Sequence, residues 1–123
     1  REFFRPFAPS VLEEKVDEYF IMPKNQLSPY MMLVGDVIEK KRTVIPAITH
    51  ADGTARVHTV SRKSNPKYWD LISEFEKITG VAVIINTSFN ENEPIVNTPK
   101  QAVECFLRTE FDVLSIGDYI VIK

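Results

Sequence analysis

The sequence predicts an α/β protein in which helices flank one open, mixed β-sheet. Several short segments are rich in β-branched residues, as is typical of strands. Two later segments begin with a proline and carry apolar residues at helical spacing, which indicates amphipathic helices. The chain has 123 residues, of which 44% are hydrophobic, and this is enough for one domain around a single core.

The first half of the chain is expected to form one short helix and three strands. Apolar residues recur at helical spacing over 12–20, whereas 24–29 is polar and bounded by prolines, which predicts a loop. Between the second and third strands, the ADGT segment is typical of the turn of an antiparallel hairpin. The three strands are expected at 31–38, 44–49 and 55–60.

The second half is expected to form two helices and three further strands. Asn65 as N-cap and Gly80 as a left-handed stop predict a helix over 66–79. Thr98 begins a second helix over 99–109 in the same way. The strands are expected at 81–87, 112–116 and 119–122. The first begins with a nearly continuous apolar run over 81–85, which is typical of a strand covered on both faces.

Composition and charge argue against several classes of function. Fifteen Lys and Arg against seventeen Asp and Glu give a net charge of −2, which disfavours binding to nucleic acid. No apolar run approaches the roughly 18 residues of a membrane span. Cys105 is the single cysteine, so the chain cannot form an internal disulfide, and a reducing cytoplasm is the expected location. Cys105 itself is expected to be an inert packing residue. Because the chain opens at Arg1 inside a dense run of aromatic and charged residues, we expect it to be a fragment of a longer protein.

Three groups of polar residues are not explained by these elements, and the first lies at the amino end. Arg1 and Arg5 are interleaved with aromatic residues over 1–9. A guanidinium can hold a phosphate by two parallel hydrogen bonds, and an apolar wall strengthens such a contact. The alternative is a solvated segment whose phenylalanines pack on the core.

The second group contains both histidines of the protein, over 49–59. A metal site would use His50, Asp52 and His58, but these need not converge and no Cys/His cluster completes a closed site, so no dedicated metal site is expected. Asp52 is expected to fix the turn. Arg56 lies on a strand otherwise made of Ala, Val, Thr and His, and it is either a ligand contact or a solvent-facing arginine.

The third group follows the apolar run at 81–85 and consists of Asn86, Thr87, Ser88 and Asn90. In open α/β sheets, ligands collect at the carboxyl ends of buried strands, where side chains and backbone amides can meet an anion. The alternative is a turn in which each side chain satisfies only the backbone of its neighbours. Ser88 has no base nearby in sequence, so nothing marks it as a nucleophile.

Together, the three groups resemble the carboxyl-terminal domain of the O-carbamoyltransferases. The matching motifs are REFFRPFAP at 1–9, HADGTAR at 50–56, NTSFN at 86–90 and EPIV at 93–96. This family includes the nodulation protein NodU type and the enzymes that decorate cephalosporin and aminoglycoside antibiotics. The similarity extends over essentially the whole chain, and three ordered motifs are more specific than any one of them.

The resemblance implies a YrdC-like twisted open mixed sheet, joined to an amino-terminal domain of the actin-like ATPase superfamily. In such enzymes the YrdC-like part takes carbamoyl phosphate and ATP and makes carbamoyl-adenylate, and the amino-terminal part passes the carbamoyl group to an acceptor hydroxyl. YrdC-like domains bind anions with a Lys-x-Arg pair and a Ser-x-Asn pair. Ser88 and Asn90 match the second pair, and Arg1 resembles the arginine of the first, whose lysine would precede this chain. His58 stands where the family pattern has glutamine.

The chemistry of carbamoyl phosphate suggests a role for each candidate residue. Transfer concentrates negative charge on phosphate oxygens, so we expect Arg5 and Arg56 to supply permanent cations. Ser88 and Asn90 would orient the carbamoyl or phosphate oxygens and complete the catalytic set. Mg²⁺ would arrive with ATP. The residues expected to bind substrate or ATP are Arg1, His50, Thr54, Asn86 and Thr87.

Two other classes of function remain open at this point. The motifs could shape a non-catalytic interaction domain, which would bind neither phosphate nor ATP. A YrdC-like surface can also hold RNA, although the charge of −2 and the lack of a Lys/Arg tract argue against a nucleic-acid module.

Overall fold

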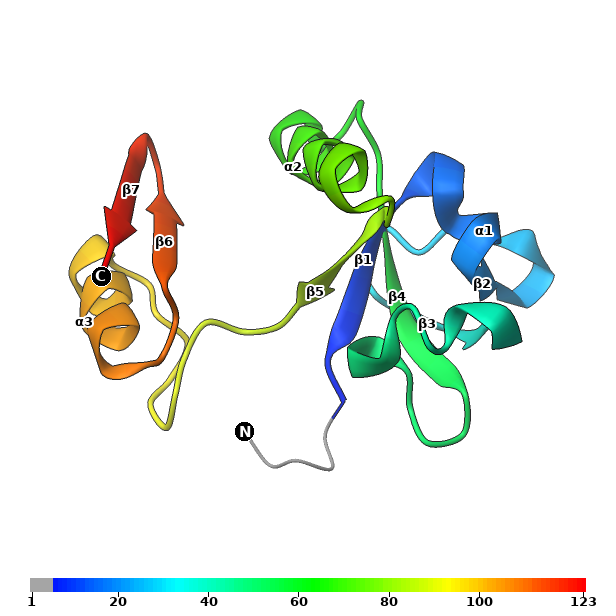
Figure 1. Cartoon of the computed structure of the whole chain (residues 1–123), viewed down its shortest axis with the longest axis horizontal. Coiled ribbons are helices and arrows are strands. Elements are labelled where there is room, and N and C mark those ends of the chain that lie inside the picture. The colour runs from blue at the N-terminus through cyan, green and yellow to red at the C-terminus, as the bar shows by residue number, and fades with distance from the viewer. Residues whose placement is uncertain (1–5) are drawn as a thin grey trace. The chain divides into compact units, whose positions relative to one another are not determined.

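A five-stranded open sheet forms the larger part of the fold, and the prediction of a mixed α/β protein is confirmed (Figure 1). The computed structural model describes residues 6–123. In the sheet order β2-β3-β4-β1-β5, β1 and β4 are parallel and every other pair is antiparallel. The strands are β1 (Ala8–Leu12), β2 (Phe20–Ile21), β3 (Leu33–Val37), β4 (Thr54–Val60) and β5 (Val83–Asn86).

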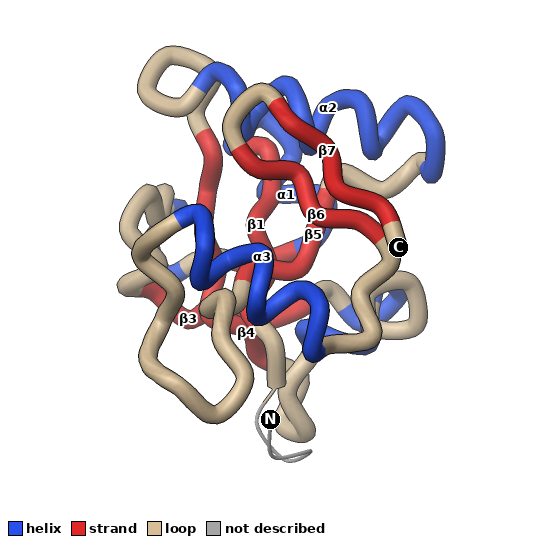
Figure 2. The backbone as a smooth tube through the Cα atoms, turned by 90° about the vertical axis from the view of Figure 1, so that its left-hand side faces the viewer, coloured by secondary structure: helices blue, strands red, loops and turns tan. Residues whose placement is uncertain are grey.

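The chain divides into two compact units, and the boundary along the sequence falls between Thr87 and Ser88. The first contains the five-stranded sheet. The second contains α3 (Pro99–Arg108) and two strands, β6 (Val113–Ile116) and β7 (Tyr119–Ile122), which pair with each other as Figure 2 shows. The prediction of six strands in one sheet is therefore corrected to a sheet of five and a separate sheet of two.

Each unit has its own buried apolar cluster, where the sequence predicted a single core. In the first unit the cluster joins side chains from β1, β3, β4 and β5 with Tyr19, Phe20 and the fully buried Ile72. In the second, the buried residues are Ala102, Cys105 and Phe106, all on α3. The expectation that Cys105 is a packing residue is confirmed.

The two main helices lie where the sequence predicts them. The first, α2 (Pro66–Thr79), lies against β1 and β5 and ends at Gly80, whose φ of 76° is left-handed (Figure 1). The side chain of Asn65 makes no capping hydrogen bond, whereas Thr98 Oγ1 accepts one from the Gln101 N–H at 3.1 Å. The expected helix over 12–20 is shorter in the structure, which has a 3₁₀ turn followed by α1 (Val16–Tyr19). The 3₁₀ helices are Glu13–Lys15, Pro23–Asn25, Glu39–Lys41 and Pro46–Ile48.

The strand predicted at 44–49 is wrong, because Pro46 begins a 3₁₀ turn there. A proline cannot donate to a strand ladder, and Thr49 Oγ1 donates back to the Ile45 carbonyl at 2.9 Å. The apolar residues of the segment serve the core: Ile45 and Ile48 are buried. The turn at 51–54 therefore leads into β4 from a 3₁₀ turn, and the hairpin predicted around it does not form.

The central strand β1 was not among the predicted strands. Pro9 lies inside it, paired with Ile85, and proline in a central strand contradicts the usual sequence pattern. The expectation that 81–85 is covered on both faces is also wrong in part: Val83 is buried, but Ile85, two residues further along the same face, is 49% exposed.

Candidate functional site

The turn before β4 is held by its own hydrogen bonds. The carboxylate of Asp52 accepts from the Thr54 N–H at 3.0 Å and from Thr54 Oγ1 at 2.7 Å, and these hydrogen bonds lower the pKa of Asp52. The Gly53 N–H donates to the His50 carbonyl at 2.9 Å, and the His50 N–H donates to the Thr54 carbonyl at 2.8 Å. The expected role of Asp52 in fixing this turn is confirmed, although the turn does not belong to a hairpin.

Arg42 contributes a cation to this turn that the sequence analysis missed. A Cβ added at Gly53 would lie 2.5 Å from Arg42 Nη2, so the guanidinium rests directly against the glycine backbone. Arg42 Nε also donates to the Val37 carbonyl at 3.2 Å. In the sequence, Arg42 belongs to an EKKR run that reads as a solvated segment, and no local signal links it to the turn eleven residues later.

Arg56 lies exposed in the middle of β4. Side chains alternate along a strand, so Arg56 shares one face of the sheet with Thr54 and His58, while Ala55 and Val57 are fully buried on the other face. Across the register, its neighbour on β3 is Val34, which is also exposed. Within residues 6–123 the guanidinium has no ion-pair or hydrogen-bond partner, so its five donors are available to a ligand.

The strand register brings an amide to the same face. Ser10 on β1 pairs with His58 on β4, so two residues earlier Ala8 lies level with Arg56. Ala8 in turn pairs with Asn86 on β5. Adjacent strands are about 4.8 Å apart, which places the Cα atoms of Arg56 and Asn86 about 10 Å apart with the small Ala8 between them.

Next to this position, a polar cluster joins four elements of the first unit. His58 Nδ1 lies 2.9 Å from the fully buried Ser10 Oγ and 3.2 Å from Asn86 Nδ2. Asn86 Nδ2 also donates to Ser10 Oγ at 3.1 Å and lies 3.4 Å from Met31 Sδ. From α2, the ring of Tyr68 stacks on His58 with centroids 5.9 Å apart.

Burial sets the protonation of this cluster. Burial lowers the pKa of His58 and outweighs a hydrogen bond to the Pro29 backbone, which acts to raise it. Because the net shift is downward, the ring is neutral around pH 7. Burial also raises the pKa of Tyr68. The sequence analysis gave no role to Ser10 or Tyr68, because nothing in the local sequence indicates that they meet His58.

In the second unit, the residues after β5 form a local turn. Asn90 Nδ2 donates to the Glu93 carbonyl at 2.8 Å, and the Val96 N–H donates to the Phe89 carbonyl at 3.1 Å. Ser88 is exposed. One N–H of the Asn90 amide thus serves the backbone of its own loop, as in the turn alternative.

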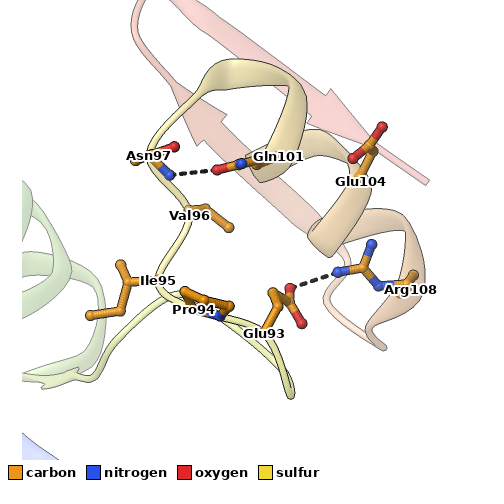
Figure 3. Close-up of a pocket in the computed structure, with 8 residues that line it drawn as sticks. All are labelled: Glu93, Pro94, Ile95, Val96, Asn97, Gln101, Glu104 and Arg108. Atoms are coloured by element: carbon orange, nitrogen blue, oxygen red, sulfur yellow. Dashed lines mark hydrogen bonds and ion pairs between the residues drawn. The ribbon is translucent and has the colours of Figure 1, made fainter.

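The second unit also has a cavity of about 490 Å³ between this loop and α3 (Figure 3). Arg108 Nη2 bonds to Glu93 Oε1 at 2.6 Å, and Arg108 Nε lies 3.5 Å from Glu91 Oε2. Since its one cation is already paired with two carboxylates, the cavity is poorly suited to an anion. The residues that line it are Glu93, Pro94, Ile95, Val96, Asn97, Gln101, Glu104 and Arg108.

The structure brings some of the predicted site residues together. His50, Thr54 and Arg56 follow one another on the turn and β4, and Asn86 joins them through the register, with the exposed Thr87 next to it. Ser88 and Asn90 belong to the second unit. Arg1 and Arg5 lie outside the described residues. The prediction that Arg5, Arg56, Ser88 and Asn90 converge on one pocket stays a prediction.

Among residues 6–123, no three His, Cys, Asp or Glu side chains are grouped so that they could hold a metal ion. None of the helices in this part of the chain is both long enough and apolar enough to cross a membrane.

An exposed arginine on one face of an open mixed sheet defines an α/β protein with a cation suited to a small anion. The chain belongs to the carbamoyltransferase C-terminus family, whose model matches residues 1–123. It is 51% identical over 125 residues to nodulation protein NolNO of Sinorhizobium fredii and 50% identical over 125 residues to nodulation protein NolO of Bradyrhizobium diazoefficiens. Nodulation protein U of Azorhizobium caulinodans is 42% identical over 90 residues, which is 73% of this chain.

The chain is much shorter than these relatives. All of it aligns with NolNO and NolO, but it spans only 18% of the first and 23% of the second, and the match spans 16% of nodulation protein U.

Proposed function

We propose that this chain binds carbamoyl phosphate and ATP and forms carbamoyl-adenylate within a larger O-carbamoyltransferase. Membership of the carbamoyltransferase C-terminus family supports the reaction class. The observation that carries the proposal is Arg56, a permanent cation without a partner among residues 6–123, beside Thr54 on an open sheet face.

The proposed reaction has two steps. Water cleaves the mixed anhydride of carbamoyl phosphate, giving carbamate and inorganic phosphate. A carbamate oxygen then attacks the α-phosphorus of ATP and expels pyrophosphate. Both steps gather negative charge on non-bridging phosphate oxygens, which a preorganised guanidinium stabilises. Each charge-assisted hydrogen bond from Arg56 would contribute about 1.5–3 kcal/mol.

The other candidate residues support this arginine. Arg1 and Arg5 would add cations from the amino end, and His50 would donate a hydrogen bond from the turn. Thr54, whose N–H and O–H both donate to Asp52, would hold that turn beside the ligand. Ser88 and Asn90 would orient the carbamoyl or phosphate oxygens, and Asn86 and Thr87 would bind substrate or ATP. Mg²⁺ would enter with the ATP phosphates. The carbamoyl group would then pass to an acceptor hydroxyl held by a partner domain of the actin-like ATPase superfamily.

The test is ligand binding by the 123-residue chain, followed as a thermal shift with carbamoyl phosphate and with Mg²⁺–ATP. We expect both ligands to raise the melting temperature and Arg56→Ala to weaken carbamoyl phosphate binding by about one to two decades. The matched control is Lys67→Ala, which removes an exposed cation from α2 and should leave binding unchanged. If neither ligand shifts the wild-type chain, the proposal is wrong and the chain is an interaction domain.

A further inference from the structure

The orientation of the Asn86 amide follows from the protonation of His58. The Pro29 backbone, which is hydrogen bonded to His58, has no N–H and can only accept, so the imidazole donates to it. Nδ1 faces Ser10 and Asn86, so the donor is Nε2, and the neutral ring has no second proton. Nδ1 is therefore an acceptor, and the Asn86 atom facing it must be the amide nitrogen.

A second contact fixes the same orientation. Asn86 Nδ2 lies 3.4 Å from Met31 Sδ, and a thioether sulfur accepts hydrogen bonds but donates none. Both N–H bonds of the amide are thus directed at Ser10, His58 and Met31. The carbonyl oxygen Oδ1 has no hydrogen-bond partner in the part of the chain that the structure describes.

An unpartnered carbonyl oxygen on this face calls for a donor in the ligand. The phosphate of carbamoyl phosphate offers only acceptors, and its oxygens suit Arg56. The amino group offers two N–H donors at the other end of the molecule, and these suit a carbonyl oxygen. Arg56 and Asn86 flank Ala8 about 10 Å apart between Cα atoms, so a small ligand can lie between the two side chains.

We propose that Asn86 recognises the amino group of the carbamoyl moiety through Oδ1, and that Ser10 and His58 are positioning residues that keep its amide in that orientation. The inference rests on the proposed function, since it assigns the recognition of one end of the same substrate. It makes Asn86 a specificity residue and Arg56 an affinity residue. Acetyl phosphate, which has a methyl group in place of the amino group, is the natural comparison.

The experiment measures the affinities of the 123-residue chain for carbamoyl phosphate and acetyl phosphate by calorimetry with fresh solutions. We expect the affinity of the wild type for carbamoyl phosphate to be about tenfold higher than that for acetyl phosphate. The reason is that the amino group of carbamoyl phosphate satisfies the Asn86 carbonyl oxygen, whereas the methyl group of acetyl phosphate leaves it without a hydrogen bond. Asn86→Ala should abolish the preference and keep the affinity for acetyl phosphate. Arg56→Ala should weaken both ligands equally. The control, Asn92→Ala, removes an exposed amide in the second unit and should preserve the preference.

The positioning role is tested at His58. In His58→Phe the stacking partner of Tyr68 remains but the acceptor is lost, so the preference should fall at unchanged affinity for acetyl phosphate. His58→Gln restores an acceptor and should restore the preference. Should His58→Phe fail to fold, Ser10→Ala removes the other contact and is expected to reduce the preference in the same way.

The outcomes separate the two proposals. Equal wild-type affinities for the two ligands, or a preference that survives in Asn86→Ala, would overturn the role of Asn86 and leave the proposed function standing. A preference unchanged in both His58→Phe and Ser10→Ala would overturn the positioning role. No binding of carbamoyl phosphate by the wild type would overturn both proposals.

Discussion

At the scale of single residues, Gly53 shows how a turn and a distant cation depend on each other. Its φ of 82° is a conformation that L side chains rarely adopt, and Arg42 Nη2 occupies the place where a Cβ would be. Gly80 has a similar φ of 76° but nothing within 4 Å of its Cβ position. Substituting Gly80 therefore measures the cost of the left-handed backbone alone, whereas substituting Gly53 adds the displacement of Arg42.

We expect Gly53→Ala to lower the free energy of unfolding by about 1 kcal/mol more than Gly80→Ala does. Both changes carry the cost of a left-handed alanine, about 1–2 kcal/mol, but only the first displaces Arg42 and disturbs its hydrogen bond to Val37. Urea unfolding checks this. In an Arg42→Ala background the difference between the two glycine variants should vanish, and its persistence would contradict the explanation.

His58 should make the stability of the first unit depend on pH. Below its unfolded pKa of 6.5 the unfolded chain binds a proton at His58 while the folded ring stays neutral. The unfolded state then binds more protons, so the free energy of unfolding falls as the pH falls from 6.5, and the loss levels off below the folded pKa. The pKa of Asp52 is also lowered, but from 3.8, and that of Tyr68 is raised from 10.0, so both titrate outside this range.

Urea unfolding between pH 7.5 and 5.5 measures this dependence. His58→Gln, which does not titrate, should lose the slope. The matched control His50→Gln keeps the half-buried imidazole of His58 and should retain the slope. A slope of the same size in His58→Gln would show that other groups carry it.

At the scale of elements, the two helix starts differ although their sequences look alike. Thr98 Oγ1 accepts a hydrogen bond from the Gln101 N–H, whereas the Asn65 side chain makes no capping bond. Thr98→Ala should therefore cost about 0.5–2 kcal/mol of unfolding free energy, and Asn65→Ala should cost much less. Chemical denaturation of the two variants side by side checks this, and equal losses would contradict it.

The same scale shows what the sequence could predict. Helix starts, the strand β4 and the turn at 51–54 were predictable because each depends on neighbouring residues. The strand β1 was not, since Pro9 contradicts the local pattern and the strand is stabilised by partners about 50 and 75 residues away. For the site, Arg56 and Asn86 were identified by residue type, but Ser10, Arg42 and Tyr68 have meaning only through the register and packing of the sheet.

At the scale of the whole molecule, the two buried clusters should respond separately to mutation. Phe106 is fully buried on α3, and Phe106→Ala typically costs about 3–5 kcal/mol at such a site. We expect hydrogen exchange to quicken over α3, β6 and β7 and to change little over β1 and β4. Ile72→Ala, the control in the other cluster, should give the reverse pattern. An equal loss of protection in both units would show that they unfold together.

The parallel pairing of β1 with β4 has a consequence for how the protein reaches its folded state. Ser10 meets His58 across 48 residues and Asn86 across 76, so the polar cluster closes two long loops in the first unit. Loop closure carries an entropic cost before any contact is gained, and proteins with such long-range contacts fold slowly. The surface that would receive the ligand therefore depends on contacts between distant parts of the chain, and no short peptide cut from the chain would contain it.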